Sequence, residues 1–247
     1  MSSLNHTVDQ MSDMKLHGMK DALLGQMEQP QYSSLTFEER LAHLIDAEVT
    51  ERRNRRIKRM LSISKLKYKD AFIEDVDFHH SRGLDRKTIL SLSNNDWVER
   101  HHNVIISGPT GTGKTYLACA LANRAITDGY SAYYTRISHL LSQTALVRAD
   151  GSYLSWATKL SRFKVLVLDD FGLSPLKSRE SQEILEFIED RVQRGSTIIT
   201  SQLPINEWHG YFNNPTIADA IMDRLVHNAY KINLKGESMR KSKNVLS

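Results

Sequence analysis

The stretch Val104-Ile-Ile-Ser-Gly-Pro-Thr-Gly-Thr-Gly-Lys-Thr115 decides the fold of this chain. Its last eight residues match the pattern G-x-x-x-x-G-K-[ST], which follows a strand and begins a helix in nucleotide-binding proteins. Both neighbours are present, because apolar Val104–Ile106 precedes the glycines and a helical pattern, Tyr116–Ala122, follows them. By chance, the four fixed positions would occur in a chain of this length roughly once in a hundred. We therefore expect a phosphate-binding loop here.

The residues of this loop have distinct expected roles. Glycines let successive backbone N–H groups curl around a polyphosphate, and the helix N-terminus adds positive potential. Lys114 is expected to reach the β- and γ-phosphates, and the Thr115 hydroxyl is expected to bind Mg²⁺. The predicted nucleotide-binding residues are Gly108, Pro109, Thr110, Gly111, Thr112, Gly113, Lys114, Thr115 and Tyr116.

An acidic motif supports the loop. Val165-Leu-Val-Leu-Asp-Asp170 places two carboxylates at the C-terminal end of a buried strand, where ligands bind in open α/β sheets. Asp169 is predicted to hold Mg²⁺ together with Thr115, and Asp170 to orient or deprotonate the attacking water. Alternatively, the two acids form a turn that caps a helix, an interpretation that Phe171-Gly172 favours and the nearby loop weakens.

A further apolar segment, Thr197–Thr200, is followed by Ser201 and Gln202. A polar side chain at this strand end is placed to bridge the attacking water and the γ-phosphate, so Gln202 is predicted to be a catalytic residue. Ordinary capping of the strand end is the alternative.

From residue 103 onward, short apolar segments alternate with helical patterns. Strands are predicted at 103–107, 132–137, 163–168, 197–200 and 230–234, and helices at 114–128, 138–149, 179–193 and 216–228. This alternation is typical of a parallel sheet flanked by helices, so the predicted fold class is α/β.

The first part of the chain has a different pattern. Residues 11–65 show helical spacing, interrupted near Pro30, and Thr36 with Glu39 forms the pattern of a capping box. We predict a helical N-terminal domain at 1–66, a connector at 67–100 and the nucleotide-binding domain at 101–247. The pairs His79-His80 and His101-His102 do not predict a metal site, because adjacent side chains point in different directions.

Positive charge is concentrated at residues 51–69. This segment has nine cations and one acid, a net charge of +8, so the other 228 residues sum to −4 in a chain of net charge +4. Such a basic block favours binding to a polyanion, and its helical pattern with few aromatic residues favours double-stranded DNA. A solvated helix face is the alternative. The predicted DNA-binding residues are Arg52, Arg53, Arg55, Arg56, Lys58, Arg59, Lys65 and Lys67.

Composition excludes several classes of protein. Hydrophobic residues make up 40% of the 247 residues and charged residues 25%, which is ordinary globular usage. No run approaches the about 18 apolar residues that cross a bilayer, and no secretory signal is visible. The single cysteine, Cys119, excludes an intrachain disulfide. We expect a soluble cytoplasmic protein without a membrane partner.

The ordered motifs GPTGTGKT, VLVLDDFG, STIITSQLP and IMDRL resemble the AAA+ ATPases of the helicase-loader branch. Two further pieces narrow the resemblance: Leu16-His-Gly-Met-Lys-Asp-Ala-Leu23 and the basic ERRNRRIKRML. Both are similar to the IstB-like insertion-sequence ATP-binding proteins, which assist transposition. The resemblance extends from about Leu16 to Lys241, and its N-terminal pieces favour this family over the DnaC-like replicative helicase loaders.

The resemblance implies a function. Members of this family are ATP-dependent DNA-binding oligomers that work with a DDE-type transposase and prepare target DNA for insertion. It implies that Lys114, Asp169, Asp170 and Gln202 act on ATP and Mg²⁺. It also implies that Arg224, in the IMDRL motif, enters the site of a neighbouring subunit. A helix-surface salt bridge between Arg224 and Asp219 or Asp223 is the alternative.

Three departures from the AAA+ pattern have consequences. Asp170 stands where glutamate is common, so its carboxylate lies one methylene farther from a water and hydrolysis is expected to be slow. Gln202 stands where asparagine is common. The chain ends soon after the last predicted strand, so the helical lid is expected to be reduced or absent, although Arg240 matches the position of a second sensor arginine.

Two other functions fit parts of the sequence. A DnaC-like helicase loader would use the basic helix to contact an acidic partner protein rather than DNA. A small-molecule phosphotransferase would share the loop, but no segment resembles a second-substrate pocket or an arginine-bearing lid, and the basic block would have no role. The sequence leaves subunit number, ring or helical assembly and target-site preference undetermined.

Overall fold

The computed structural model describes residues 3–78 and 82–239. The chain divides into two compact units, Met1–Arg59 and Met60–Ser247. Residues His79, His80 and Arg240, which the sequence singled out, lie outside the described residues. No described helix is both long enough and apolar enough to cross a membrane.

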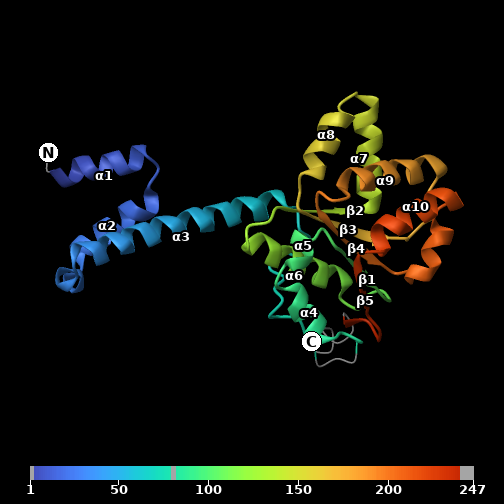
Figure 1. Ribbon diagram of the computed structural model, residues 1–247, viewed down its shortest axis with the longest axis horizontal. Coiled ribbons are helices and arrows are strands. Elements are labelled where there is room, and N and C mark those ends of the chain that lie inside the picture. Colours follow the sequence, from blue (N-terminus) through green and yellow to red (C-terminus); the bar gives the residue numbers. More distant parts are fainter. Residues whose placement is uncertain (1–2, 79–81, 240–247) are drawn as a thin grey trace, which may run out of the picture. The chain divides into compact units, whose positions relative to one another are not determined.

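The first unit is helical, as predicted (Figure 1). Its elements are α1 (Ser3–Asp13), α2 (His17–Glu28), the short 3-10 helix η1 (Pro30–Ser34) and α3 (Phe37–Ile63), whose last residues belong to the second unit. The predicted capping box at the start of α3 is confirmed. The Thr36 N–H donates to Glu39 Oε2 at 2.8 Å, and the Glu39 N–H donates to Thr36 Oγ1 at 3.3 Å.

Helices α2 and α3 approach each other closely at Gly18. A Cβ atom at this position would lie 2.5 Å from the carbonyl oxygen of Ala47 and 2.8 Å from Glu51 Cβ. Nearby, buried Glu48 accepts a hydrogen bond from the Met19 N–H at 3.1 Å. The glycine of the Leu16–Leu23 motif therefore has a packing role, because no larger residue fits between the two helices.

The second unit is built on a five-stranded parallel sheet with strand order β2-β3-β4-β1-β5. Its elements along the chain are α4 (Arg86–Leu92), α5 (Asp96–Glu99), β1 (Asn103–Ser107), α6 (Lys114–Thr127), β2 (Ala132–Arg136), α7 (Ile137–Ala149), α8 (Tyr153–Ser161), β3 (Val165–Phe171), α9 (Ser178–Arg191), β4 (Ser196–Ser201), the 3-10 helix η2 (Ile205–Tyr211), α10 (Pro215–Val226) and β5 (Ala229–Asn233). Every predicted strand is present, so the predicted α/β class is confirmed.

The main differences from the predicted elements are at β3 and in helices that the sequence pattern missed. β3 continues through the acidic pair to Phe171 rather than ending at Leu168. Helix α8 was not predicted, and α1 and the short α4 and α5 lie in segments without a recognised helical pattern. These helices bury few residues, and a short buried face leaves a weak periodic signal in the sequence.

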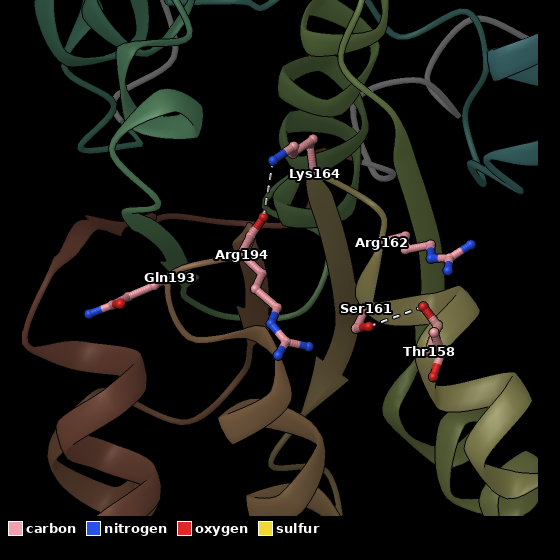
Figure 2. A pocket seen from close by; sticks show the side chains of 6 residues that line it. All are labelled: Thr158, Ser161, Arg162, Lys164, Gln193 and Arg194. Carbon is pink, nitrogen blue, oxygen red and sulfur yellow. Dashed lines mark hydrogen bonds between the residues drawn. The ribbon is translucent and has the colours of Figure 1, made fainter.

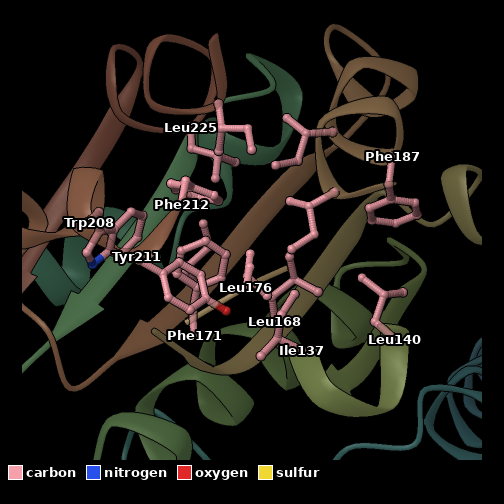
Figure 3. Packing of buried hydrophobic residues seen from close by; sticks show 14 of the residues in the cluster. Ile137, Leu140, Leu168, Phe171, Leu176, Phe187, Trp208, Tyr211, Phe212 and Leu225 are labelled. Carbon is pink, nitrogen blue, oxygen red and sulfur yellow. The ribbon is translucent and has the colours of Figure 1, made fainter. Parts of the chain in front are cut away.

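The core packs on both faces of this sheet. On one face, Leu166 and Leu168 of β3 meet side chains from α7, α9 and α10, together with a group of aromatic rings (Figure 3). Phe171 is the centre of that group, with its ring centroid 4.7 Å from Trp208 and 5.0 Å from Tyr211. Helix α6 buries ten of its 14 residues. This packing fixes the carboxyl ends of β1, β3 and β4, where the predicted site residues lie.

Candidate nucleotide-binding site

The phosphate-binding loop joins β1 to α6, as the sequence predicted. Gly108 and Gly113 have φ angles of +143° and +94°, which favour glycine. Gly113 is the residue immediately before α6, so the loop ends at the helix N-terminus. Within the loop, the Thr112 hydroxyl donates to the Pro109 carbonyl at 2.9 Å.

Lys114 is buried and folded back onto the loop. Its Nζ donates to the carbonyl oxygens of Gly108 and Pro109 at 2.6 and 2.7 Å. Burial lowers the pKa of this ammonium group, while the carboxylates of Asp169 and Asp170 act in the opposite direction. The ammonium therefore lies inside the curve of the loop, where two backbone carbonyls hold it.

Asp169 is completely buried at the end of β3 and accepts hydrogen bonds from three hydroxyl groups. Thr115 Oγ1 donates to its Oδ1 at 2.9 Å, and Thr200 Oγ1 of β4 donates to the same oxygen. Tyr134 Oη of β2 donates to its Oδ2 at 2.6 Å. Three elements thus fix this carboxylate beside the first turn of α6.

The arrangement fits a magnesium nucleotide. Mg²⁺ in phosphate sites is bound by one or two protein oxygens together with phosphates and water, and the hydrogen bond between Thr115 and Asp169 brings two such oxygens together. The predicted metal-binding pair is therefore adjacent in space, although 53 residues separate the two positions in the chain.

Asp170 departs from the regular strand. Its φ angle is +62°, and the register between β3 and β4 shifts between Leu168 and Phe171. Bulges of this kind redirect a side chain and are frequent next to active sites. The Asp170 N–H donates to Thr200 Oγ1 at 3.2 Å, and its Oδ2 lies 3.5 Å from Arg136 Nε. The second acid therefore forms an ion pair rather than capping a helix.

Gln202 contacts the phosphate-binding loop, and Tyr116 follows it in the first turn of α6. Gln202 Oε1 accepts a hydrogen bond from the Thr110 hydroxyl at 2.9 Å, so its amide lies against the phosphate-binding loop. The Tyr116 ring packs near Tyr68, with 6.0 Å between centroids. Gln202 thus contacts the loop, and its catalytic role stays a prediction, while Tyr116 contacts the segment that follows α3.

Arg224 of α10 forms its ion pair with a residue that the sequence did not indicate. Its Nη2 donates to Glu189 Oε1 of α9 at 2.7 Å, and its Nη1 donates to the Ala220 carbonyl at 2.9 Å. The alternative prediction of a salt bridge was right, but its partner, Asp219 or Asp223, was wrong. The Asp219 carboxylate instead contacts His209 at 2.8 Å. The partner of Arg224 therefore lies on the neighbouring helix α9 rather than on α10.

Two segments distant in sequence close around the loop. The Arg82 Nη1 donates to the Thr112 carbonyl at 3.1 Å. After β5, the Met239 N–H donates to the Gly111 carbonyl at 3.0 Å, and Ser238 lies where a Cβ on Gly111 would be. The predicted loss of a helical lid concerns the chain beyond Met239, outside the described residues.

Sequence reasoning missed Tyr134, Arg136, Thr200 and Arg82. Thr200 was inside a quoted strand, and its position at the strand end was the available signal. Tyr134 and Arg136 alternate on β2, but only the pairing of β2 with β3 brings them to Asp169 and Asp170. No local sequence signal marks Arg82.

The predicted DNA-binding residues are all exposed. Arg52, Arg53, Arg55, Arg56, Lys58 and Arg59 lie in α3, whereas Lys65 and Lys67 follow its end. Arg52 pairs with Glu48 at 2.6 Å and Arg55 with Glu51 at 3.3 Å, each one turn away along the helix. The basic stretch therefore presents its cations to solvent.

A separate hollow of about 540 Å³ lies at the end of the sheet opposite to the phosphate-binding loop (Figure 2). Lys164 precedes β3 and Arg194 precedes β4, so the hollow opens at the amino ends of these strands. Thr158, Ser161, Arg162 and Gln193 complete its lining. It is distant from the phosphate-binding loop, and we assign it no part in nucleotide binding.

Comparison with known proteins places the chain among insertion-sequence proteins. The family described as IstB-like ATP binding protein matches residues 9–247. A relative in Sinorhizobium fredii, named as an insertion sequence ATP-binding protein, is 43% identical over 236 residues, covering 96% of each chain. The corresponding protein of insertion sequence IS1162 from Pseudomonas fluorescens is 43% identical over 199 residues, covering 81% of this chain and 86% of that protein.

Solved structures with the same fold include the DnaC helicase loader, with a TM-score of 0.59 and 20% identity, covering 68% of this chain and 99% of that chain. DnaA bound to AMPPCP and single-stranded DNA has a TM-score of 0.56 and 17% identity, covering 72% of this chain and 55% of that chain. These similarities confirm the predicted fold, a parallel sheet flanked by helices.

Proposed function

Because this chain belongs to the IstB-like ATP-binding proteins, we propose that it is an ATP-hydrolysing, DNA-binding helper of an insertion-sequence transposase. It oligomerises on double-stranded target DNA in the cytoplasm and prepares that DNA for insertion, and hydrolysis controls the assembly. The observation that carries the proposal is the contact of Thr115 with Asp169 beside buried Lys114, in a chain whose eight predicted DNA-binding cations are all exposed.

The residues of the site have separate proposed roles in hydrolysis. Lys114 exchanges its two carbonyl partners for β- and γ-phosphate oxygens, and Thr115 with Asp169 would hold Mg²⁺. When bound, Mg²⁺ neutralises charge on the phosphates. Asp170 orients the attacking water and accepts its proton as the bond to the γ-phosphorus forms and the bond to the leaving oxygen breaks. Gln202 orients the same water from the end of β4.

Arg224 is proposed to act on a neighbouring subunit. An arginine that reaches the γ-phosphate in trans makes hydrolysis depend on assembly, because its charge stabilises the transition state. In the single chain its guanidinium contacts Glu189. Assembly would therefore exchange this intramolecular ion pair for a contact with the neighbour's nucleotide.

Sizing by light scattering tests the proposal. We expect a large complex only when the protein, Mg-ATP and duplex DNA are mixed, with smaller species when either ligand is omitted. Phosphate release measured on the same samples reports hydrolysis. A protein that stays monomeric in every mixture and releases no phosphate would contradict the proposed function.

The helicase-loader alternative makes a different prediction about partners. The similarity to DnaC is a similarity of fold at 20% identity, so it does not indicate that this chain binds the same partner protein. Affinity capture with the full chain is expected to retain a transposase encoded beside it. Retention of a replicative helicase in place of the transposase would favour the loader.

A further inference from the structure

The hollow at the amino ends of β3 and β4 is lined by positive and neutral side chains (Figure 2). Its cations are Arg162, Lys164 and Arg194, and all three are exposed to solvent. Of the described residues that line it, none is Asp or Glu, and in the described part of the chain neither arginine forms an ion pair. Three positive charges therefore face one hollow, which we refer to as the basic hollow.

A fourth cation holds together the segments that carry these lining residues. Arg191, the last residue of α9, is only 2% exposed. Its guanidinium donates to the carbonyl oxygens of Leu160, Phe163 and Ser196 at 3.3, 3.0 and 2.8 Å. Burial lowers the pKa of Arg191 to about 10, so the group is still charged at neutral pH. None of these partners is an acid, and a buried charge that no acid neutralises attracts an anion to the adjoining surface.

Close packing shapes the basic hollow. A Cβ atom on Gly195 would lie 2.9 Å from Arg191 Nη2 and 2.9 Å from the Lys164 carbonyl oxygen, so the chain there is pressed against its neighbours. Buried Ser161 donates from its hydroxyl to the Thr158 carbonyl at 3.1 Å. Packing and hydrogen bonds thus fix the backbone around the hollow before any ligand arrives, as in most binding sites.

We propose that the basic hollow binds an acidic segment of a partner protein, a short extended stretch whose Asp or Glu carboxylates contact Arg162, Lys164 and Arg194. The inference goes beyond the proposed function, because this contact needs neither ATP nor DNA. A guanidinium group binds a carboxylate through two parallel N–H···O bonds, which gives such a contact direction as well as charge.

Size and lining favour a protein segment over a nucleic acid. A cubic hollow of about 540 Å³ would be roughly 8 Å wide, which admits one extended peptide at the roughly 5 Å spacing of strands in a sheet. Duplex DNA does not enter it, since the major groove alone is about 12 Å wide. Single-stranded nucleic acid binds largely by stacking its bases on aromatic rings, and none of the described lining residues is aromatic.

The basic hollow and the nucleotide site lie at opposite ends of the same strands. Lys164 immediately precedes β3, whereas Asp169 lies near its carboxyl end. Arg194 lies just before β4, whereas Thr200 lies near the other end of that strand. A partner bound in the hollow therefore leaves the phosphate-binding loop open, and substitutions in the hollow should not change nucleotide affinity.

The double variant Arg162→Ala/Arg194→Ala tests the basic hollow, with Arg86→Ala/Lys87→Ala of α4 as the matched control. Each removes two exposed cations from the second unit. The probe is a fluorescein-labelled hexaglutamate peptide, whose anisotropy is measured with the full chain at low ionic strength, where exposed charges are least screened. We expect the hollow variant to bind it roughly tenfold more weakly than the control variant. Equal affinities of the two variants for hexaglutamate would overturn the proposal.

Labelled duplex and single-stranded DNA, titrated with the same two variants, separate a protein site from a nucleic-acid site. We expect the hollow variant to bind both DNA forms as the control does, and to bind a fluorescent ATP analogue with unchanged affinity. A loss of DNA affinity as large as the loss of peptide affinity would make the hollow a nucleic-acid surface and overturn the proposal. Failure of the wild-type chain to hydrolyse ATP or assemble on DNA would contradict the proposed function alone, because the peptide measurement depends on neither.

Discussion

The nucleotide site and the basic stretch of α3 hold their charged groups in opposite ways. Lys114 and Asp169 are buried, and each is fixed by hydrogen bonds from or to the protein. The six cations of the basic stretch that lie in α3, Arg52 to Arg59, are exposed. Two of them form ion pairs one turn away along the helix, Arg52 with Glu48 and Arg55 with Glu51. Buried groups act individually through fixed geometry, whereas exposed cations act together through a field that salt screens. Substitutions in the two regions should therefore differ in size and in salt dependence.

Lys114→Ala should have the largest effect. Removing the one buried ammonium from the curve of the loop is expected to lower ATP affinity at least about 100-fold, because truncating one member of a desolvated charge pair costs several kcal/mol. Titration with a fluorescent ATP analogue measures it. Lys231→Ala, an exposed lysine on β5, is the control. If the Lys114 variant bound ATP about as tightly as the control variant, the buried lysine would contribute no more than an exposed one, which would contradict the prediction.

Gly18→Ala tests whether the N-terminal unit depends on the close approach of α2 and α3. The added Cβ would clash with the Ala47 carbonyl, so we expect a loss of about 2 kcal/mol in stability. Gly25→Ala in the same helix is a matched control, because a Cβ there meets nothing within 4 Å and should stabilise by about 0.5–1 kcal/mol. Calorimetry of the full chain compares the two, and equal melting temperatures would contradict the packing role.

The double variant Lys58→Ala/Arg59→Ala should weaken duplex binding about tenfold near 0.1 M salt and lower the salt slope by about two. The matched control is Arg86→Ala/Lys87→Ala, which removes two exposed cations from α4. Anisotropy titrations at several salt concentrations measure both slopes. Identical slopes in the two variants would show that the basic stretch is an ordinary solvated helix face.

Glu48→Gln should give the smallest change, and one that depends on pH. The hydrogen bond from Arg52 is the main cause that lowers the pKa of Glu48. Because the folded pKa lies below the unfolded one, the stabilisation is complete above the unfolded value and is lost as pH falls through the folded value. We expect the variant to melt roughly 2–4 °C below wild type at neutral pH and at the same temperature in acid. A constant difference across pH would exclude the ionised Glu48 as its source.

Sequence alone predicted the elements that local spacing determines. The strand, loop and helix around Gly108–Thr115 follow from fixed glycine positions, and the capping box at Thr36 from two side chains three residues apart. Both signals are contained within about ten residues. The acidic pair was placed at a strand end, but its bulge, with Asp170 at positive φ, has no counterpart in the hydrophobic pattern.

Contacts between residues on different strands or helices could not be predicted from the sequence. Thr200, Tyr134 and Asp169 come from three different strands and meet only because β2, β3 and β4 are neighbours. The partner of Arg224 was sought within its own helix, where spacing is informative, and was found on α9. Residues that touch through the order of a sheet or the packing of helices require the three-dimensional arrangement.

The contact between Arg224 and Glu189 also bears on how dilute solutions of this protein behave. Their side chains are 32% and 48% exposed, so opening the pair costs at most about 1 kcal/mol. If Arg224 binds the nucleotide of a neighbouring subunit, breaking this pair weakens the free energy of association at each subunit interface by the same amount. The concentration at which oligomers first form then rises by up to roughly fivefold. A chain with glutamine at position 189 would then begin to polymerise at a lower threshold, with its nucleotide site unaltered.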